Sequence, residues 1–92
     1  MADVKIQTLH PTLGKTNKKI DRDKYGLMRT EILSILKGRE LTHNELFAAL
    51  EQNLKGNFDG AIGWYGETVK LDLEARKIIE RTTDKPQKYK IA

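Results

Sequence analysis

The chain has 92 residues, a formal net charge of +4 and no cysteine, so we expect one small domain without disulfides or thiolate metal sites. Its only histidines, His10 and His43, are too far apart in sequence to predict a metal site, and no apolar run approaches the ~18 residues of a membrane span. These features predict a cytoplasmic protein with no metal or cofactor, and the first residues lack the apolar core of a signal peptide.

Positive charge is concentrated at the two ends of the chain. Residues 1–24 carry six Lys or Arg against three Asp or Glu, whereas residues 25–81 carry eight against nine. Residues 82–92 carry three against one. A phosphate backbone would attract both ends, although lysine also serves simply to keep tails and turns soluble.

Residues 1–20 lack helical periodicity and are predicted to form a partly flexible N-terminal arm. Val4, Ile6 and Thr8 alternate with polar residues, which allows a short edge strand. The arm carries a basic cluster of Lys15, Lys18 and Lys19. It could lie along a nucleic-acid groove, or it could be a solvated leader partly tied to the domain, which is the commoner case.

A first helix is predicted from Asp21 or Asp23 to Lys37. Aspartate can cap the free amides at a helix start, and Gly38 suits the left-handed residue that follows a helix end. The apolar face of this helix is expected to be scaffold, with five residues at helical spacing: Tyr25, Met28, Ile32, Ile35 and Leu36.

A second helix is predicted to begin at Thr42, because Thr42 and Glu45 have the spacing of a capping box. The helix should end at Lys55-Gly56-Asn57. Its inward stripe consists of Leu46, Ala49, Leu50 and Leu54.

A third helix is predicted between Gly60 and Arg76, and its apolar residues fall on two stripes. One contains Ile62, Tyr65, Val69 and Leu73, and the other, roughly opposite, contains Trp64, Leu71 and Ala75. A surface helix needs only one apolar stripe. The second stripe should therefore be covered by the N-terminal arm, by a second subunit or by the C-terminal segment folding back, unless both stripes are buried in a compact core.

The last part of the chain is predicted to form a β-ribbon. Ile78–Arg81 is expected to be a strand, Thr82–Lys88 a turn containing Pro86, and Tyr89–Ile91 the returning strand. Two short strands are marginal alone, so they must pack on the helices.

The nine residues Leu73–Arg81, LEARKIIER, resemble the end of a winged-helix recognition helix: Leu-Glu, two polar residues, glycine, two aliphatic residues, a polar residue and arginine. Lys77 stands where that signature has glycine, and lysine tolerates a left-handed turn at a cost of ~1 kcal/mol or more. Residues 63–76, GWYGETVKLDLEAR, also resemble the hallmark of a small bacterial winged-helix family of unknown function. The resemblance implies a mainly α fold with a small β-hairpin (α+β) over residues 21–92, a winged helix-turn-helix of three helices and a two-stranded wing.

The first functional hypothesis is a DNA-binding winged helix, acting as a transcriptional regulator or accessory factor, with the third helix in the major groove and the wing on the backbone. Base readout would come from the exposed helix face through Thr68, Lys70, Arg76 and Lys77. Phosphate contacts would come from Lys85, Lys88 and Lys90 in the wing and from Lys15, Lys18 and Lys19 in the arm. Residues 67–77 sum to zero charge, which is unusual for a strong groove binder.

The alternative is a protein-interaction or dimerisation module on the same scaffold, with no nucleic-acid role. Its interface would be the second stripe, Trp64, Leu71 and Ala75. An exposed helix face rich in Lys and Arg would favour nucleic acid, whereas one bearing Trp64 and Leu71 would favour a protein partner. We predict no enzymatic activity, because no nucleophile–base pair, metal cluster or phosphate loop is evident.

Overall fold

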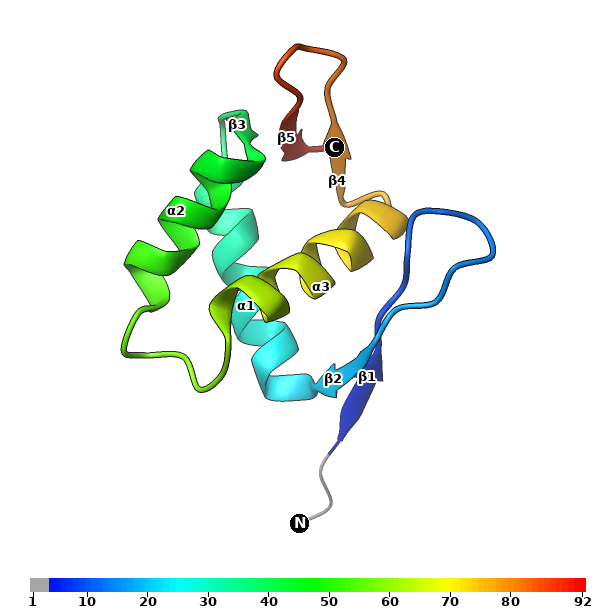
Figure 1. The fold of residues 1–92 in the computed structure, drawn as a ribbon, viewed down its shortest axis with the longest axis vertical. Coiled ribbons are helices and arrows are strands. Elements are labelled where there is room, and N and C mark those ends of the chain that lie inside the picture. The colour runs from blue at the N-terminus through cyan, green and yellow to red at the C-terminus, as the bar shows by residue number, and fades with distance from the viewer. Residues whose placement is uncertain (1–3) are drawn as a thin grey trace.

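The computed structural model describes residues 4–92 as three helices, a two-stranded hairpin and a three-stranded antiparallel sheet (Figure 1). In chain order the elements are β1 (Lys5–Gln7), β2 (Lys19–Asp21), α1 (Arg22–Leu36), β3 (Leu41–Thr42), α2 (His43–Leu54), α3 (Ile62–Ala75), β4 (Ile79–Arg81) and β5 (Lys88–Ile91). The predicted class, a small α+β domain, is confirmed. Within residues 4–92 no helix is both long and apolar enough to cross a membrane.

Local capping signals set the starts of the first two helices. The Asp21 carboxylate accepts hydrogen bonds from the backbone amides of Asp23 and Lys24 at 3.1 and 3.2 Å. At α2 both halves of the capping box form: Glu45 N–H donates to Thr42 Oγ1 at 3.2 Å, and Thr42 N–H donates to Glu45 Oε1 at 2.9 Å. Such a cap contributes on the order of 1 kcal/mol.

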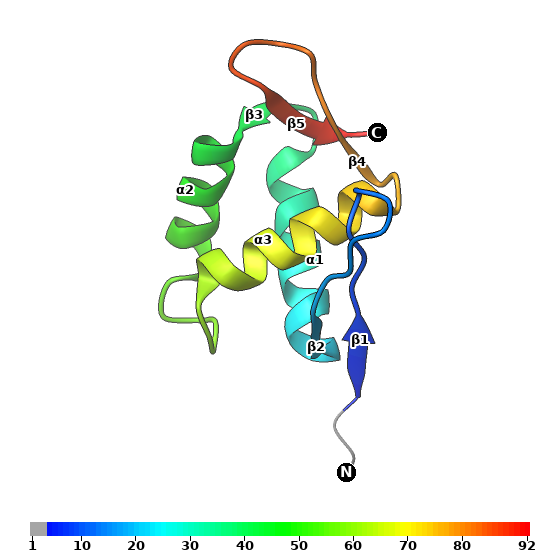
Figure 2. The same cartoon turned by 45° about the vertical axis from the view of Figure 1, so that its right-hand side comes forward.

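The core lies where α3 crosses α1, with α2 packed beside both (Figures 1 and 2). Each helix supplies fully buried aliphatic residues, and the sheet adds further residues from β4 and β5. The core includes Met28, Ile32, Leu46, Leu50, Val69, Leu73, Ile79 and Tyr89. The predicted inward stripe of α3 is therefore correctly placed, although its member Tyr65 is only half-buried.

The predicted C-terminal ribbon is present and gains a third strand. β4 pairs with β5 in antiparallel register, with Glu80 opposite Lys90. β5 also pairs with β3, which places Leu41 opposite Tyr89. Strand β3 was not predicted: it has two residues, it lies directly before the cap of α2, and only pairing with the distant β5 defines it.

The described part of the predicted arm forms a hairpin, called here the N-terminal hairpin: β1, the loop of residues 8–18, and β2. Ile6 lies opposite Ile20, whose side chain is buried. Thr8 is also buried, and the loop runs up beside the C-terminal end of α3 (Figures 1 and 2). The predicted edge strand around Ile6 is present as β1, whereas residues 1–3 of the predicted arm lie outside the described residues.

Candidate functional site

The side of α3 that faces the N-terminal hairpin is covered. Thr68 is only 5% exposed, and Asn17 Nδ2 donates to its carbonyl oxygen at 3.1 Å. Asn17 Nδ2 also donates to the carbonyl of Leu9 at 2.9 Å, so one amide joins both sides of the loop to α3. The prediction that Thr68 lies on an exposed face was wrong, because the hairpin packs over that side of the helix.

Lys70, the second residue predicted to be exposed, is buried under the sheet. It is 1% exposed, and its Nζ lies 3.2 Å from Tyr89 Oη and 4.3 Å from the centre of the Tyr89 ring. Nζ also lies 3.6 Å from Glu67 Oε1 and 3.5 Å from Glu74 Oε2. A buried ammonium group must be paired to be tolerated. The prediction that Lys70 lies on an exposed helix face was therefore wrong, because this cation ties α3 to β5.

Glu74 completes this network, because its carboxylate also accepts hydrogen bonds from Arg81 Nε and Nη2. The bond to Glu74 raises the pKa of Arg81 above its ordinary value. Lys70 and Arg81 together balance the charges of Glu67 and Glu74. The network is therefore neutral, and it offers no free charge to a polyanion.

A second buried carboxylate fastens the N-terminal hairpin and α1 to α3. Asp72 is fully buried and accepts hydrogen bonds from Leu9 N–H at 2.8 Å, from Arg76 Nε at 2.9 Å and from the Tyr25 hydroxyl. Burial and the bond to Asp72 raise the pKa of Tyr25 to about 12. Arg76, a predicted DNA contact, is exposed but paired with Asp72.

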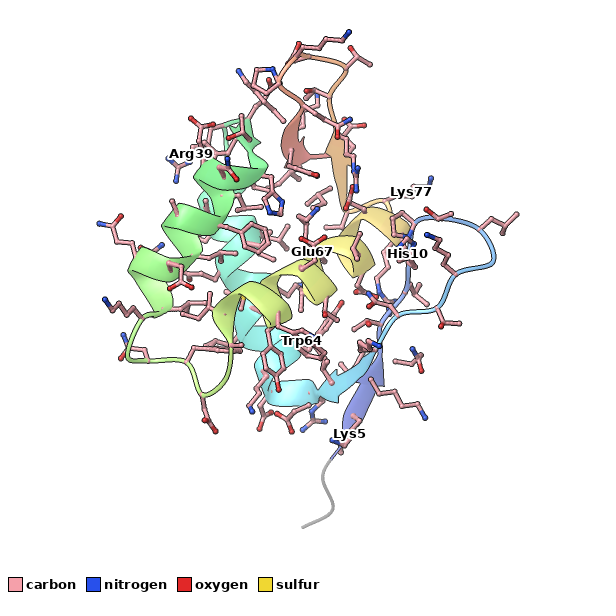
Figure 3. All side chains as sticks on the ribbon, viewed as in Figure 1. Lys5, His10, Arg39, Trp64, Glu67 and Lys77 are labelled. Carbon is pink, nitrogen blue, oxygen red and sulfur yellow. The ribbon has the colours of Figure 1, made fainter. Side chains whose placement is uncertain are left out.

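These contacts leave uncovered one face of α3, called here the outward stripe: Trp64, Glu67, Leu71 and Ala75. Trp64 is 46% exposed, and the Glu67 side chain is 44% exposed. Leu71 and Ala75 are half-buried. The stripe presents an indole, a carboxylate and two aliphatic side chains, and none of its four residues is a cation. Figure 3 shows Trp64 and Glu67 along α3, with Lys77 and His10 at the far end of the helix.

The exposed indole is held by neighbouring aromatic rings. Trp64 meets the Tyr65 ring edge-on, with 4.8 Å between the ring centres. Tyr65 in turn meets Phe58 edge-on at 5.2 Å. A large aromatic side chain that is supported in this way loses little conformational freedom on docking.

A groove opens at the C-terminal end of the outward stripe, between α3, the hairpin loop and β4. Its volume is about 570 Å³, and its apolar lining comes from Pro11, Leu71 and Ile79. Lys77 stands at its edge and forms no ion pair with any residue from 4 to 92. No sequence spacing could indicate this groove, because its lining comes from three separate segments of the chain.

The structure does not gather the remaining predicted phosphate contacts on the outward stripe. Lys15, Lys18 and Lys19 are exposed on the N-terminal hairpin. In the ribbon Lys85 is exposed, whereas Lys88 and Lys90 are half-buried and Lys90 lies 3.7 Å from Glu80. The hairpin loop and the tip of the ribbon project in different directions from the end of α3 (Figure 1).

Within the part of the chain that the structure describes, no group of three or more His, Cys, Asp or Glu could hold a metal ion. A family model described as a family of unknown function, DUF6958, matches residues 5–89, from β1 into β5. Comparison with curated proteins and with solved structures found no match.

Proposed function

Because the chain belongs to the DUF6958 family, whose function is unknown, we propose its function from its own surface. It is a dimerisation module on a winged-helix scaffold, and it docks a second copy of the chain on the outward stripe of α3.

Two features support the winged-helix part of the proposal. The first is the order of the elements: α1, β3, α2, α3, β4 and β5. In the sheet β5 lies between β3 and β4, so the C-terminal ribbon of a three-helix domain is joined by β3, the strand between the first two helices. The second is the backbone of Lys77, which occupies the position of glycine in the winged-helix signature. Its φ of 64° is the left-handed conformation that glycine adopts readily.

The observation that carries the proposal is the composition of the outward stripe. A helix that reads a major groove offers Arg, Lys, Asn or Gln to base edges. Here the outward stripe consists of Trp64, which is 46% exposed, and of Glu67, Leu71 and Ala75, which are half-buried, while Lys70 is buried. Exposed aromatic and aliphatic side chains in a row are typical of protein interfaces.

The shape of the molecule supports a second copy as the occupant. The domain is a slab with extents of 45, 35 and 18 Å, and α3 runs across its broad face (Figure 1). A standard interface buries ~800 Å² on each partner, and a face of this size can supply that area. When two copies contact each other through the same patch, the patch is fully used and the assembly ends at two subunits.

Light scattering coupled to size exclusion tests the proposal. The expected mass is about 21 kDa, twice the 10.5 kDa of one chain. Leu71→Asp should give a monomer, because it places a carboxylate at the centre of the interface. Ala48→Asp, at an exposed position of α2, is the control. A wild-type monomer at several hundred micromolar, or a dimer that Leu71→Asp leaves intact, contradicts the proposal.

A second candidate is duplex DNA bound through phosphate contacts alone. One observation favours it: the exposed lysines of the N-terminal hairpin, Lys15, Lys18 and Lys19, form no ion pair among residues 4–92. Such contacts give affinity without sequence information. This candidate does not need α3 to enter a groove, so it is compatible with a dimer formed through the outward stripe.

A further inference from the structure

We infer that a hollow in the loop of the N-terminal hairpin, called here the hairpin hollow, is a binding site for a phosphate group. The hollow has a volume of about 380 Å³ and is lined by Gln7, Thr8, Leu9, Lys15, Thr16 and Asn17. The inference deepens the second candidate function and rests on it for the source of the phosphate.

The charge of the lining favours an anion. It contains one cation, Lys15, and no carboxylate. The groove beside β4 contains three glutamates, and the hollows at the end of α1 and along the ribbon both contain Glu40. Lys15 forms no ion pair with any residue from 4 to 92, so its ammonium group is free to meet a ligand.

The same lining holds further hydrogen-bond donors that have no partner in the described chain. The backbone N–H groups of Thr16 and Asn17 and the hydroxyl of Thr16 donate no hydrogen bond to residues 4–92. Phosphate oxygens accept hydrogen bonds from backbone N–H groups, hydroxyls and lysine, and neighbouring backbone N–H groups with no partner form anion sites in many proteins. The donors of the hollow therefore match a phosphate group.

The walls of the hairpin hollow are fixed by hydrogen bonds that do not use these donors. Gln7 Nε2 donates to the carbonyls of Thr8 and Asn17 at 3.0 and 2.9 Å, which bridges the two sides of the loop. Asn17 Nδ2 joins the loop to α3, and Leu9 N–H donates to the buried Asp72. A site that is ordered in advance loses less conformational freedom when it binds.

The strands of the hairpin extend the positive surface away from the hollow. Residues 4–22 carry five Lys or Arg and one carboxylate, that of Asp21, which caps α1. Lys19 lies opposite Gln7 and therefore shares its face of the hairpin. Lys5 lies on the same face, two residues before Gln7 and roughly 7 Å along the strand. Figure 3 shows Lys5 at the end of the hairpin away from the loop.

This row of cations distinguishes between two sources of a phosphate group. A free phosphate would occupy the hairpin hollow alone and would leave Lys5 and Lys19 unused. A nucleic-acid strand carries a phosphate at every nucleotide, and each one that is neutralised adds to the affinity. We therefore expect the hollow to take one phosphodiester of a strand whose neighbouring phosphates face Lys19 and Lys5.

A titration followed by ¹H–¹⁵N spectra of the full chain tests the hollow directly. Sodium phosphate is raised to tens of millimolar while sodium chloride keeps the ionic strength constant. The amide signals of Thr16 and Asn17 should shift and saturate, because their N–H groups bind the phosphate oxygens, and a short DNA duplex should shift the same signals. Shifts that are no larger at Thr16 and Asn17 than at Thr83, which is exposed on the ribbon, overturn the inference.

Substitutions separate the hairpin hollow from a general attraction between charges. Lys15→Ala should weaken phosphate binding roughly tenfold, as expected for the loss of one charge-assisted hydrogen bond. Thr16→Val keeps the shape and charge of an exposed side chain but removes its hydroxyl, and it should weaken binding roughly fivefold. Thr16→Ser should retain most of the affinity. Thr83→Val is the matched control and should bind as wild type.

Fluorescence anisotropy with a labelled duplex separates failure of the hollow from failure of DNA binding. Weaker duplex binding by Lys15→Ala and Thr16→Val, with Thr83→Val unchanged, supports both. A duplex that binds wild type and Thr16→Val equally overturns the inference and leaves the second candidate function intact. If sodium phosphate shifts the Thr16 and Asn17 signals but no duplex binds, the hollow is a site for a free phosphate and the DNA candidate fails. No response to either ligand overturns both.

Discussion

At the scale of single residues, the charged side chains of α3 mainly hold the fold together. Lys70 connects the helix to β5 through Tyr89, and Asp72 connects it to the N-terminal hairpin and to α1. Across residues 4–92 no buried side-chain nitrogen or oxygen lacks a hydrogen-bond partner. The zero net charge of residues 67–77 is therefore a sum over residues that are largely paired inside the molecule.

The buried Tyr25–Asp72 pair predicts how stability depends on alkaline pH. The pKa of Tyr25 is raised to about 12 in the folded protein, against about 10 for an exposed tyrosine. The stabilisation is complete below pH ~10. Above that pH the unfolded chain loses the phenolic proton first, so the free energy of unfolding falls until pH ~12, by roughly 2–3 kcal/mol.

Chemical denaturation at several values between pH 9 and 12 measures this dependence. Tyr25→Phe should be less stable at pH 8, because the hydroxyl that donates to Asp72 is lost, but its stability should change less with pH. Tyr65→Phe is the control, since the Tyr65 hydroxyl makes no side-chain hydrogen bond among the described residues. A Tyr25→Phe variant with the same pH dependence as wild type would contradict the assignment.

The exposed residues of α3 could be predicted from the sequence only in part. The inward stripe follows from helical periodicity, which is a local property. Thr68 and Lys70 were placed outside because a helical wheel does not show which other elements cover a given side. Their burial depends on Asn17 and Tyr89, which lie 51 and 19 positions away in the chain.

At the scale of elements, the α3–β4 junction shows how the backbone accommodates lysine where the winged-helix signature that the sequence resembles has glycine. Lys77 has φ 64°. Its N–H donates to the carbonyl of Glu74 at 3.1 Å, and Ile78 N–H donates to that of Leu73 at 2.9 Å. These two bonds are the Schellman pattern that normally ends at glycine. The backbone thus keeps the glycine conformation although the residue is lysine.

We therefore predict that Lys77→Gly stabilises the folded monomer by about 1 kcal/mol, because glycine removes the steric cost of the left-handed backbone. Lys77→Ala is the matched control: it removes the same charged side chain but keeps a Cβ. Urea denaturation should therefore rank glycine above alanine at position 77. Equal stability of the two variants would mean that the junction relaxes out of the left-handed conformation.

Elements whose residue patterns lie within one short stretch of sequence were predicted well, whereas strands that are defined only by pairing with another segment were not. The capping box at Thr42, the glycine stop at Gly38 and the ribbon pairing of β4 with β5 were all read from neighbouring residues. By contrast, β2 begins at Lys19, within a polar Lys18-Lys19 pair, and is defined by pairing with β1. Strand β3 is defined by β5. Such pairings depend on long-range contacts that a single sequence does not reveal.

At the scale of the whole molecule, two surfaces of different character lie on different elements. The outward stripe of α3 is apolar and acidic, whereas the N-terminal hairpin carries Lys15, Lys18 and Lys19. The hairpin is fastened to α3 through Leu9 and Asn17, which contact Asp72 and Thr68 and no residue of the outward stripe. Protein docking and phosphate binding can therefore be tested by separate substitutions.

If the hairpin binds duplex DNA through phosphates, affinity should fall steeply with salt, because each neutralised phosphate contributes about 0.9 to the slope of log affinity against log salt. Replacing Lys15 and Lys18 with alanine should weaken binding and reduce this slope by up to about two. Fluorescence anisotropy with a labelled duplex at several salt concentrations measures both effects.

The matched control for this titration replaces Lys37 and Lys55, which are exposed after α1 and α2, and so lowers the net charge equally. A general attraction of a +4 protein for a polyanion would weaken to the same extent in both double variants, whereas specific hairpin contacts would weaken only in the first. Leu71→Asp should leave the slope of log affinity against log salt, calculated per chain, unchanged, since the outward stripe makes no phosphate contact in this scheme. Equal loss in both double variants, or no binding at low salt, would leave dimerisation as the only proposed role.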